Sequence, residues 1–237
     1  MMKIQSSSAV PACDESEIYE QLLPLKGAEV LELGCGKAEK TLKIAQAGPV
    51  KKIVALEVDA IQHAENLRRS VPANVRFESG GAQAIPAEGE SFDIVLMFKS
   101  LHHVPVESMD TAMHEICRVL KRGGLAYFSE PVFAGDFNEI LRLFHDERMV
   151  REAAFAAVTN AVASGQFALV SQTFFSAPVH FESFSQFEEN VLRVTHTRHQ
   201  LSPDMYRQVQ QGFMRHMTDE GARFEMPMRV DLLRKNG

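Results

Sequence analysis

Short apolar runs alternate with helical patterns over the first half of this 237-residue chain. From Ile18 to Pro131 this order is typical of parallel strands joined by crossover helices. The runs predict five strands, at 29–33, 52–58, 75–78, 92–98 and 125–129. A helix is predicted between the last two strands, because apolar residues at 109, 112, 113, 116 and 120 share one face and Gly123-Gly124 would end it. The pattern therefore predicts an α/β architecture.

The pattern changes after Pro131. Residues 137–163 contain neither Gly nor Pro and are rich in Ala, Leu and Glu, which predicts one long helix or a helix pair. Ser202 and Pro203 fit the N-cap and first turn of a later helix. Residues 224–234 alternate between apolar and polar, which predicts a half-exposed strand. We expect one domain in three parts: a core at 1–131, a helical elaboration at 132–222 and a last strand at 223–237.

Composition narrows the class of protein. Hydrophobic residues make up 45% and charged residues 24%, as in an ordinary globular protein. With a net charge of −6, the chain has no excess of basic residues to bind the phosphates of nucleic acid. No apolar run approaches the ~18 residues of a membrane span, and the N-terminus predicts a short disordered lead-in. The three cysteines lack CxxC spacing, so we expect no disulfides and no zinc site, as in a cytoplasmic protein. The charge and the lack of a long apolar run predict neither nucleic-acid nor membrane partners. The oligomeric state stays open.

A glycine turn follows the first predicted strand. The segment VLELGCGKAEK places Gly34-Cys35-Gly36 where backbone can approach a ligand at the end of a strand. A dinucleotide site would have a third glycine at position 39, but Glu39 stands there and would repel a pyrophosphate. S-adenosylmethionine has no phosphate and carries a positive sulfonium, so Glu32 and Glu39 are compatible with it. A tight turn that binds nothing is the alternative.

An acidic residue ends the second predicted strand. Glu57 follows the glycine turn by about 20 residues, the interval at which an acidic side chain reaches ribose hydroxyls in nucleotide-binding units. Asp59 competes for this role, and a solvated carboxylate is the alternative for either residue. Glu57 is favoured because it continues the strand register.

Five segments together resemble the class I S-adenosylmethionine-dependent methyltransferases. They are the glycine turn, Glu57, GGAQAIP, FDIVLMFKSLHHV and EICRVLKRGGLAYFSEP, and they extend roughly from Glu29 to Pro131. The resemblance implies a Rossmann-like, seven-stranded, mostly parallel sheet with an antiparallel last strand and helices on both faces. It also implies that the elaboration at 132–222 binds substrate or acts as a lid.

The same resemblance implies which residues would bind S-adenosylmethionine. They are Glu32, Gly34, Cys35, Gly36, Glu57, Val58, Gly81, Ala82, Gln83 and Phe98. Glu32 and the two glycines would line the methionine part, Glu57 would hold the ribose and the Ala82 backbone would meet the adenine.

Two positions depart from the family pattern. Ala38 stands where the pattern has Gly, which adds one methyl group to the turn. Gly81 stands where it usually has Asp, and Gln83 occupies the following acidic position. An acceptor for the adenine amino group is therefore missing or has moved to the Gln83 amide oxygen.

The end of the fourth strand holds the candidate catalytic residues Lys99, His102 and His103. Methyl transfer needs a nucleophile held ~3 Å from the methyl group, and a general base only where the nucleophile must lose a proton. An imidazole titrates near neutral pH, but both histidines could instead pack or cap the next helix. Lys99 would bind an anionic substrate group or reach solvent.

Other candidates are open to two interpretations. Glu130 would face the same cleft and contact substrate or cofactor. Four phenylalanines could wall an apolar pocket or fill the core: Phe133, Phe137, Phe174 and Phe175. A basic cluster could meet an anionic substrate or form a solvated helix face: Arg193, His196, Arg198 and His199. No metal is expected, because the histidines lack i, i+4 spacing with a third ligand.

The sequence thus predicts in-line methyl transfer from S-adenosylmethionine to a small-molecule acceptor. Two alternatives use the same core: a tRNA or protein methyltransferase, and a cofactor-binding protein without methylating activity. The acidic pI and the lack of a separate RNA-binding domain favour the small molecule.

Overall fold

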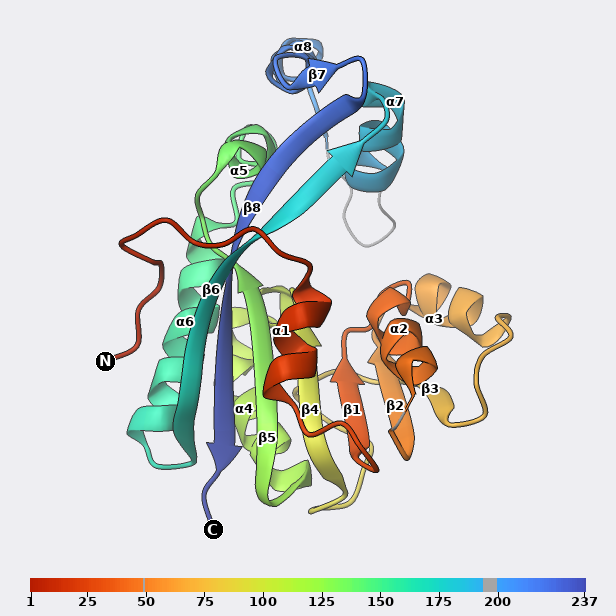
Figure 1. Cartoon of the computed structure of the whole chain (residues 1–237), viewed down its shortest axis with the longest axis vertical. Coiled ribbons are helices and arrows are strands. Elements are labelled where there is room, and N and C mark those ends of the chain that lie inside the picture. Colours follow the sequence, from red (N-terminus) through yellow and green to blue (C-terminus); the bar gives the residue numbers. More distant parts are fainter. Residues whose placement is uncertain (49, 194–199) are drawn as a thin grey trace.

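One mostly parallel sheet forms the centre of the computed structural model (Figure 1), which describes residues 1–48, 50–193 and 200–237. Its strands are β1 (Glu29–Leu33), β2 (Lys52–Glu57), β3 (Val75–Ser79), β4 (Phe92–Phe98), β5 (Leu120–Pro131), β6 (Phe167–Phe181), β7 (Met217–Thr218) and β8 (Gly221–Lys235). The order is β3-β2-β1-β4-β5-β8-β6, and β7 pairs with β8 off this path. Strands β1 to β5 are parallel, and β8 is antiparallel to both β5 and β6. The Rossmann-like sheet with an antiparallel last strand is confirmed.

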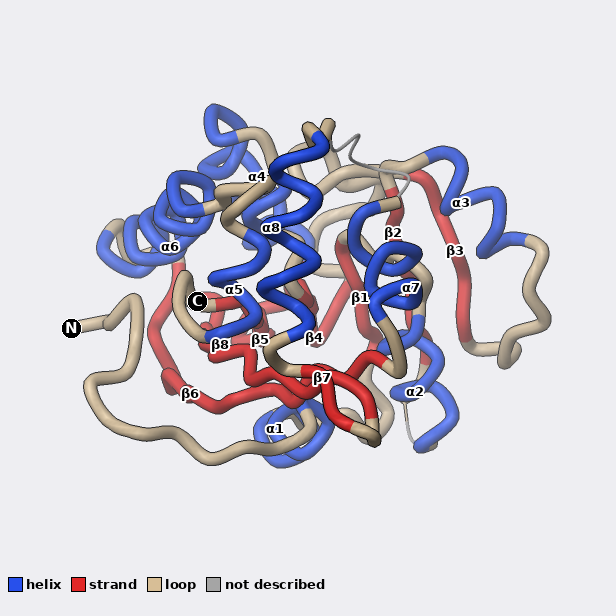
Figure 2. Tube along the Cα trace, turned by 90° about the horizontal axis from the view of Figure 1, so that it is seen from above, coloured by secondary structure: helices blue, strands red, loops and turns tan. Residues whose placement is uncertain are grey.

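Helices cover both faces of the sheet (Figure 2). They are α1 (Glu15–Leu22), α2 (Glu39–Ala47), α3 (Ala60–Leu67), α4 (Met109–Val119), α5 (Asp136–Leu141), α6 (Arg148–Ala163), α7 (Phe184–Phe187) and α8 (Pro203–Met214), with short turns at Leu101–His103, Val106–Ser108 and Glu188–Leu192. Tyr19 of α1 and Ile44 of α2 belong to the core on one face, and Met113 of α4 and Ala157 of α6 to the core on the other. No helix among the described residues combines the length and apolar character that a membrane span requires.

The central strands lie where their sequences predict. β1 and β4 have the predicted bounds because each is mostly apolar and almost wholly buried, as expected between two helix layers. The strand order reverses between β1 and β4, so the loops that follow these two strands border the crevice where α/β sheets bind ligands.

The long strands β6 and β8 extend beyond the sheet into a second small core (Figure 1). We call α5, α7, α8 and the adjoining ends of β6 and β8 the aromatic cap. Its buried rings are those of Phe137, Phe181, Phe187, Phe213 and Phe224, and their centroids lie 5.2–6.4 Å apart in tilted, stacked and edge-on pairs. Ser202 caps α8 as predicted, because its side chain accepts a hydrogen bond from Met205 N.

Three expectations need correction. Residues 132–222 are not wholly helical, because they include the 15-residue β6, an edge strand with no regular alternation of buried and exposed positions. The lead-in is not disordered: Ser176 of β6 accepts from Cys13 N at 3.1 Å and donates to Pro11 O at 2.8 Å. Helix α4 ends at Val119, before Gly123-Gly124, because Leu120 already begins β5. The division of the chain at 131 and 222 stays an interpretation.

Candidate cofactor and active site

The glycine turn is held tightly between β2 and β4. Gly34 N and Cys35 N both donate to Leu56 O at 3.0 Å. Gly34 has φ of +71°, and a Cβ there would lie 2.8 Å from Ser100 Cβ, so only glycine fits this position. Gly36 has φ of +51°, and a Cβ there would meet no atom within 4 Å. The turn therefore leaves open space beside Gly36, where a ligand can approach the backbone.

Ala38, the departure from the family pattern, also has a left-handed backbone. Its φ is +56° and its side chain is fully buried. This conformation costs an L-residue roughly 1–2 kcal/mol, which glycine would not incur. The turn therefore has a left-handed residue at this position despite the added methyl group.

Glu57 lies directly against the glycine turn. Its Oε2 accepts from Gly36 N at 2.7 Å, and its Oε1 accepts from Val58 N at 2.8 Å and Asp59 N at 2.9 Å. A carboxylate offers about four acceptor positions, so one remains for a ribose hydroxyl. Asp59 has a different role, because it caps α3 by accepting from Ile61 N at 2.8 Å.

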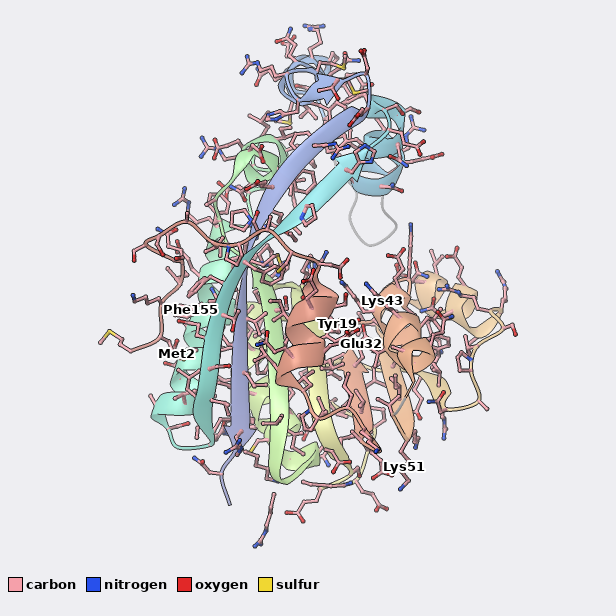
Figure 3. All side chains as sticks on the ribbon, in the orientation of Figure 1. Met2, Tyr19, Glu32, Lys43, Lys51 and Phe155 are labelled. Carbon is pink, nitrogen blue, oxygen red and sulfur yellow. The ribbon has the colours of Figure 1, made fainter. Side chains whose placement is uncertain are left out.

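Glu32 is a second buried carboxylate at this edge of the sheet. It is 2% exposed and lies near Tyr19 of α1 (Figure 3). Thr41 of α2 donates to it at 2.5 Å. Burial raises the pKa of Glu32 from 4.5 to about 7; Glu15 and Glu57 add to this effect, and Thr41 and Lys40 oppose it. A cationic ligand beside Glu32 would favour its ionised form.

We expect this carboxyl to affect stability in a pH-dependent way. The folded protein keeps the Glu32 proton between about pH 4.5 and 7, whereas the unfolded chain has lost it. The free energy of unfolding therefore falls as pH rises through this window. Glu32→Gln should remove that loss, so the variant gains on the order of 3 kcal/mol over the wild type between pH 4.5 and pH 8. Urea unfolding at both pH values checks this, and a difference independent of pH would contradict it.

The predicted adenine segment follows β3, beside Glu57. Gly80 N donates to Glu57 O at 3.2 Å. The Gln83 side chain folds back over Gly81, where a Cβ would lie only 2.6 Å from Gln83 Oε1. The Gln83 carboxamide thus takes up space that a side chain at 81 would need. Ala82 is buried beside it, and Val58 is 66% exposed.

Two further residues predicted to bind the cofactor, Cys35 and Phe98, are mostly buried in the core. Cys35 is 8% exposed, and burial raises the pKa of its thiol well above its usual range. The Phe98 ring packs between Tyr19 and Tyr127, with centroids at 5.9 and 5.5 Å. Phe98 therefore shapes the floor of the site from within the core.

Lys99 begins the loop after β4 in a strained conformation. Its φ is +53°, and its backbone N–H donates to Ser129 O at 2.7 Å. Such backbone strain at a non-glycine residue is concentrated at functional sites in proteins. The side chain is exposed, so a cation lies at the crevice predicted to hold the sulfonium.

His102 lies between two carboxylates. It is 4% exposed; its Nδ1 contacts Glu130, and its Nε2 lies 3.6 Å from Glu147 Oε1. Burial opposes protonation, but Glu130 and Glu147 outweigh it and raise the pKa of His102 to about 9. Because both ring nitrogens face carboxylates, His102 is suited to hold its neighbours in place rather than to accept a proton.

The cluster around His102 extends to α6. Arg151 Nη2 donates to Glu147 Oε2 at 2.5 Å, and Leu101 N donates to Glu130 Oε1 at 2.9 Å. Glu130 is 2% exposed, so it supports His102 and does not line an open cleft as expected. His103, by contrast, is exposed, and its ring centroid lies 4.1 Å from that of His102.

Sequence reasoning missed four residues of this site: Thr41, Asn66, Glu147 and Arg151. Asn66 of α3 is fully buried and donates to Gly36 O at 2.7 Å. A polar residue within a helical pattern gives no signal that it faces inward. Glu147 and Arg151 lie in a stretch predicted only as helical, so the sequence offered no reason to pair them with His102.

The remaining candidates lie elsewhere. Phe137 packs in the aromatic cap and Phe175 in the sheet core, as the core-filling interpretation requires. Phe133 stacks under Arg148, whose guanidinium is 4.4 Å from the ring centroid, and Phe174 pairs with Arg229 along β8. Of the basic cluster, His196, Arg198 and His199 fall outside the described residues.

A surface hollow of about 360 Å³ lies away from this site. It borders Glu29, Lys52 and Phe92, which begin three of the strands, whereas the glycine turn and Glu57 lie at the strand ends. The hollow therefore belongs to the opposite edge of the sheet.

Comparison with known proteins agrees with this geometry. A family model described as a methyltransferase domain matches residues 30–124. The YcgJ protein from Bacillus subtilis has a similar structure, with a TM-score of 0.65, 18% identity and coverage of 93% of this chain and 97% of that one. The fold is the Rossmann-like fold of methyltransferase domains. Residues 30–124 are therefore similar to a methyltransferase domain.

Two relatives are similar to part of this chain. Demethylmenaquinone methyltransferase from Lactococcus lactis is 34% identical over 104 residues, which is 42% of this chain and 40% of the relative. The 27-O-demethylrifamycin SV methyltransferase from Amycolatopsis mediterranei is 31% identical over 107 residues, 44% of this chain and 39% of the relative. The chain thus spans about two fifths of the length of these relatives.

Proposed function

We propose that this protein transfers the methyl group of S-adenosylmethionine to a small-molecule acceptor. The observation that carries the proposal is the contact between the glycine turn and Glu57, which joins a backbone bend and a strand-end carboxylate at the carboxyl edge of the sheet. The residues present fit this cofactor: space is open beside Gly36, and two buried carboxylates suit a cationic ligand. The two relatives are named for menaquinone and rifamycin precursors, which supports a small-molecule acceptor.

The chain's own residues would act by holding the reactants. The glycine turn and Glu57 would orient the cofactor, while Lys99 and His103 present exposed polar groups after β4. His102 would position this loop through Glu130 and Glu147. The aromatic cap stands beyond the carboxyl end of the sheet (Figure 1), where it would exclude water from the reacting atoms.

A transfer assay tests the proposed acceptor class. The protein is incubated with methyl-labelled S-adenosylmethionine and, separately, with a metabolite extract, bulk tRNA and a protein extract. We expect label in the metabolite fraction alone, and none with a Gly34→Val variant. Label in tRNA or protein would contradict the small-molecule acceptor, and cofactor binding without any transfer would favour the non-methylating alternative.

Lys99→Met tests whether the acceptor carries an anionic group. If Lys99 pairs with that group, the Michaelis constant for the acceptor should rise about tenfold. Cofactor affinity should stay equal or improve slightly, because one cation near the sulfonium has been removed. Lys99→Arg is the matched control and should keep most of the activity. Unchanged constants in Lys99→Met would show that this side chain only reaches solvent.

A further inference from the structure

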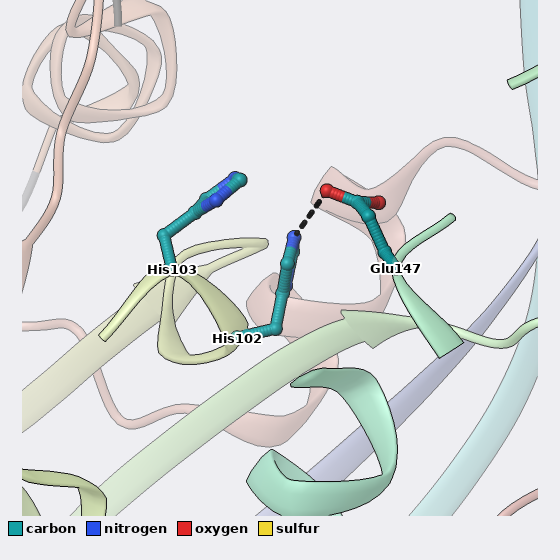
Figure 4. A group of neighbouring side chains, drawn as sticks. All are labelled: His102, His103 and Glu147. Atoms are coloured by element: carbon teal, nitrogen blue, oxygen red, sulfur yellow. Dashed lines mark ion pairs between the residues drawn. The ribbon is translucent and has the colours of Figure 1, made fainter. Parts of the chain in front are cut away.

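We propose that His102, His103 and Glu147 form a binding site for a divalent transition-metal ion, with zinc the best match. Each residue offers one ligand atom, and these atoms all lie within 4.8 Å of one another. Figure 4 shows the three side chains converging from the turn after β4 and from the start of α6. Two imidazoles and one carboxylate are the donor set of zinc sites that keep a fourth position for water or substrate.

The spacing between two of the ligands already suits an ion. His102 Nε2 and Glu147 Oε1 are 3.6 Å apart. Two ligands of a tetrahedral zinc ion, each ~2.1 Å from it, lie ~3.4 Å from one another. Only His103 has to adjust, and it is the exposed member of the group.

The two buried ligands, His102 and Glu147, each have a second polar atom that contacts another side chain. His102 directs its Nδ1 to Glu130, which leaves Nε2 facing the site. Glu147 is the N-cap residue of α6 but makes no side-chain capping bond, and Arg151 instead anchors its Oε2 at 2.5 Å. A carboxylate behind a histidine ligand and a hydrogen bond on a carboxylate ligand are typical outer-shell features of metal sites.

The charges around the site also favour a cation. Glu130 and Glu147 are both buried and both lie beside His102, and the guanidinium of Arg151 pairs with Glu147. Two further histidines, His103 and His145, lie near these carboxylates. The Nε2 atom of His145 is 3.1 Å from Glu147 Oε1. A divalent ion bound at His102 Nε2 would take the place of the proton there as the positive charge between these carboxylates.

The site would define the class of acceptor, an inference that rests on the proposed function. An ion beside the loop after β4 would bind an acceptor oxygen or sulfur and lower the pKa of its proton. The proton would leave to water, a bond would form between that atom and the methyl carbon, and the carbon–sulfonium bond would break. The geometry therefore points to acceptors with an ionisable hydroxyl or thiol group.

Metal titration tests the site without any need for turnover. The full chain, freed of metal by chelator dialysis, is titrated with zinc by calorimetry and with cobalt(II) by absorption. We expect one ion per chain, and visible cobalt bands without the thiolate charge-transfer band that cysteines would give. His103→Ala should weaken binding at least tenfold, and Glu147→Gln should weaken it further. His114→Ala, an exposed histidine on α4, is the matched control and should bind as the wild type does.

Two outcomes would overturn the site: no binding at ~0.1 mM zinc, or equal affinity in His103→Ala and the wild type. Because His103 is exposed, that variant is expected to fold, and circular dichroism checks it. Titration of the same samples with S-adenosylmethionine separates the two proposals. Cofactor binding without metal binding would overturn the metal site alone, and metal binding without cofactor binding would overturn the proposed function alone.

Discussion

Glu57→Ala should weaken the binding of S-adenosylmethionine by about 3 kcal/mol, roughly a hundredfold in Kd. The substitution removes the acceptor proposed for the ribose. It also removes the carboxylate that accepts from three backbone amides, including Gly36 N at 2.7 Å, so the glycine turn loses a partner that fixes its shape. Isothermal titration calorimetry with the cofactor and with S-adenosylhomocysteine measures both effects together.

Asp59→Asn is the matched control for this result. Asp59 is two residues away and caps α3, and asparagine is an equally good N-cap residue. The control should therefore bind the cofactor as the wild type does. An unchanged Kd in Glu57→Ala, or an equal loss in Asp59→Asn, would place the ribose contact elsewhere.

Phe213→Ala should lower the free energy of unfolding by about 3–5 kcal/mol. Phe213 of α8 is fully buried at the centre of the aromatic cap, where its ring packs against Phe184, Phe187 and Phe224 at 5.2–5.6 Å between centroids. Its removal leaves a cavity that the neighbouring rings fill only in part. If the cap covers the acceptor, turnover should fall far more than cofactor affinity, because the glycine turn and Glu57 lie outside the cap.

Met214→Ala controls for the change in helix α8. Met214 is the next residue and is 51% exposed, so its substitution should change stability by less than about 0.5 kcal/mol. Urea unfolding of both variants is the measurement. Equal stability of Phe213→Ala and the wild type would mean that the buried rings of the cap do not form a packed core.

The sheet could be predicted well because buried parallel strands leave a strong sequence signal. β1 and β4 are mostly apolar and almost wholly buried, and their bounds agree with the prediction. β6 was missed because a strand at the edge of the sheet has no need of regular alternation. Helix α1 was missed for another reason: its start is marked only by a capping box, in which Asp14 and Glu17 satisfy each other's backbone N–H groups.

The local structure of the glycine turn and Glu57 was more predictable than the surroundings of His102. Gly34 and Glu57 follow from local rules, because a left-handed turn and a strand-end carboxylate are visible in a short segment. The surroundings of His102 were not predictable, since they depend on how α6 packs beside β5 and brings Glu147 and Arg151 to the loop after β4. Lys99, His102 and His103 accordingly stay predictions as catalytic residues.

Direct binding of the cofactor tests the central claim, which is that the glycine turn and Glu57 form a site for S-adenosylmethionine. The measurement is a calorimetric titration of the wild type with S-adenosylhomocysteine, repeated with Gly34→Ala, whose new Cβ would collide with Ser100. We predict one site per wild-type chain and no measurable binding to the variant. Equal binding to both proteins, or no binding of either S-adenosyl ligand to the wild type, would contradict the claim.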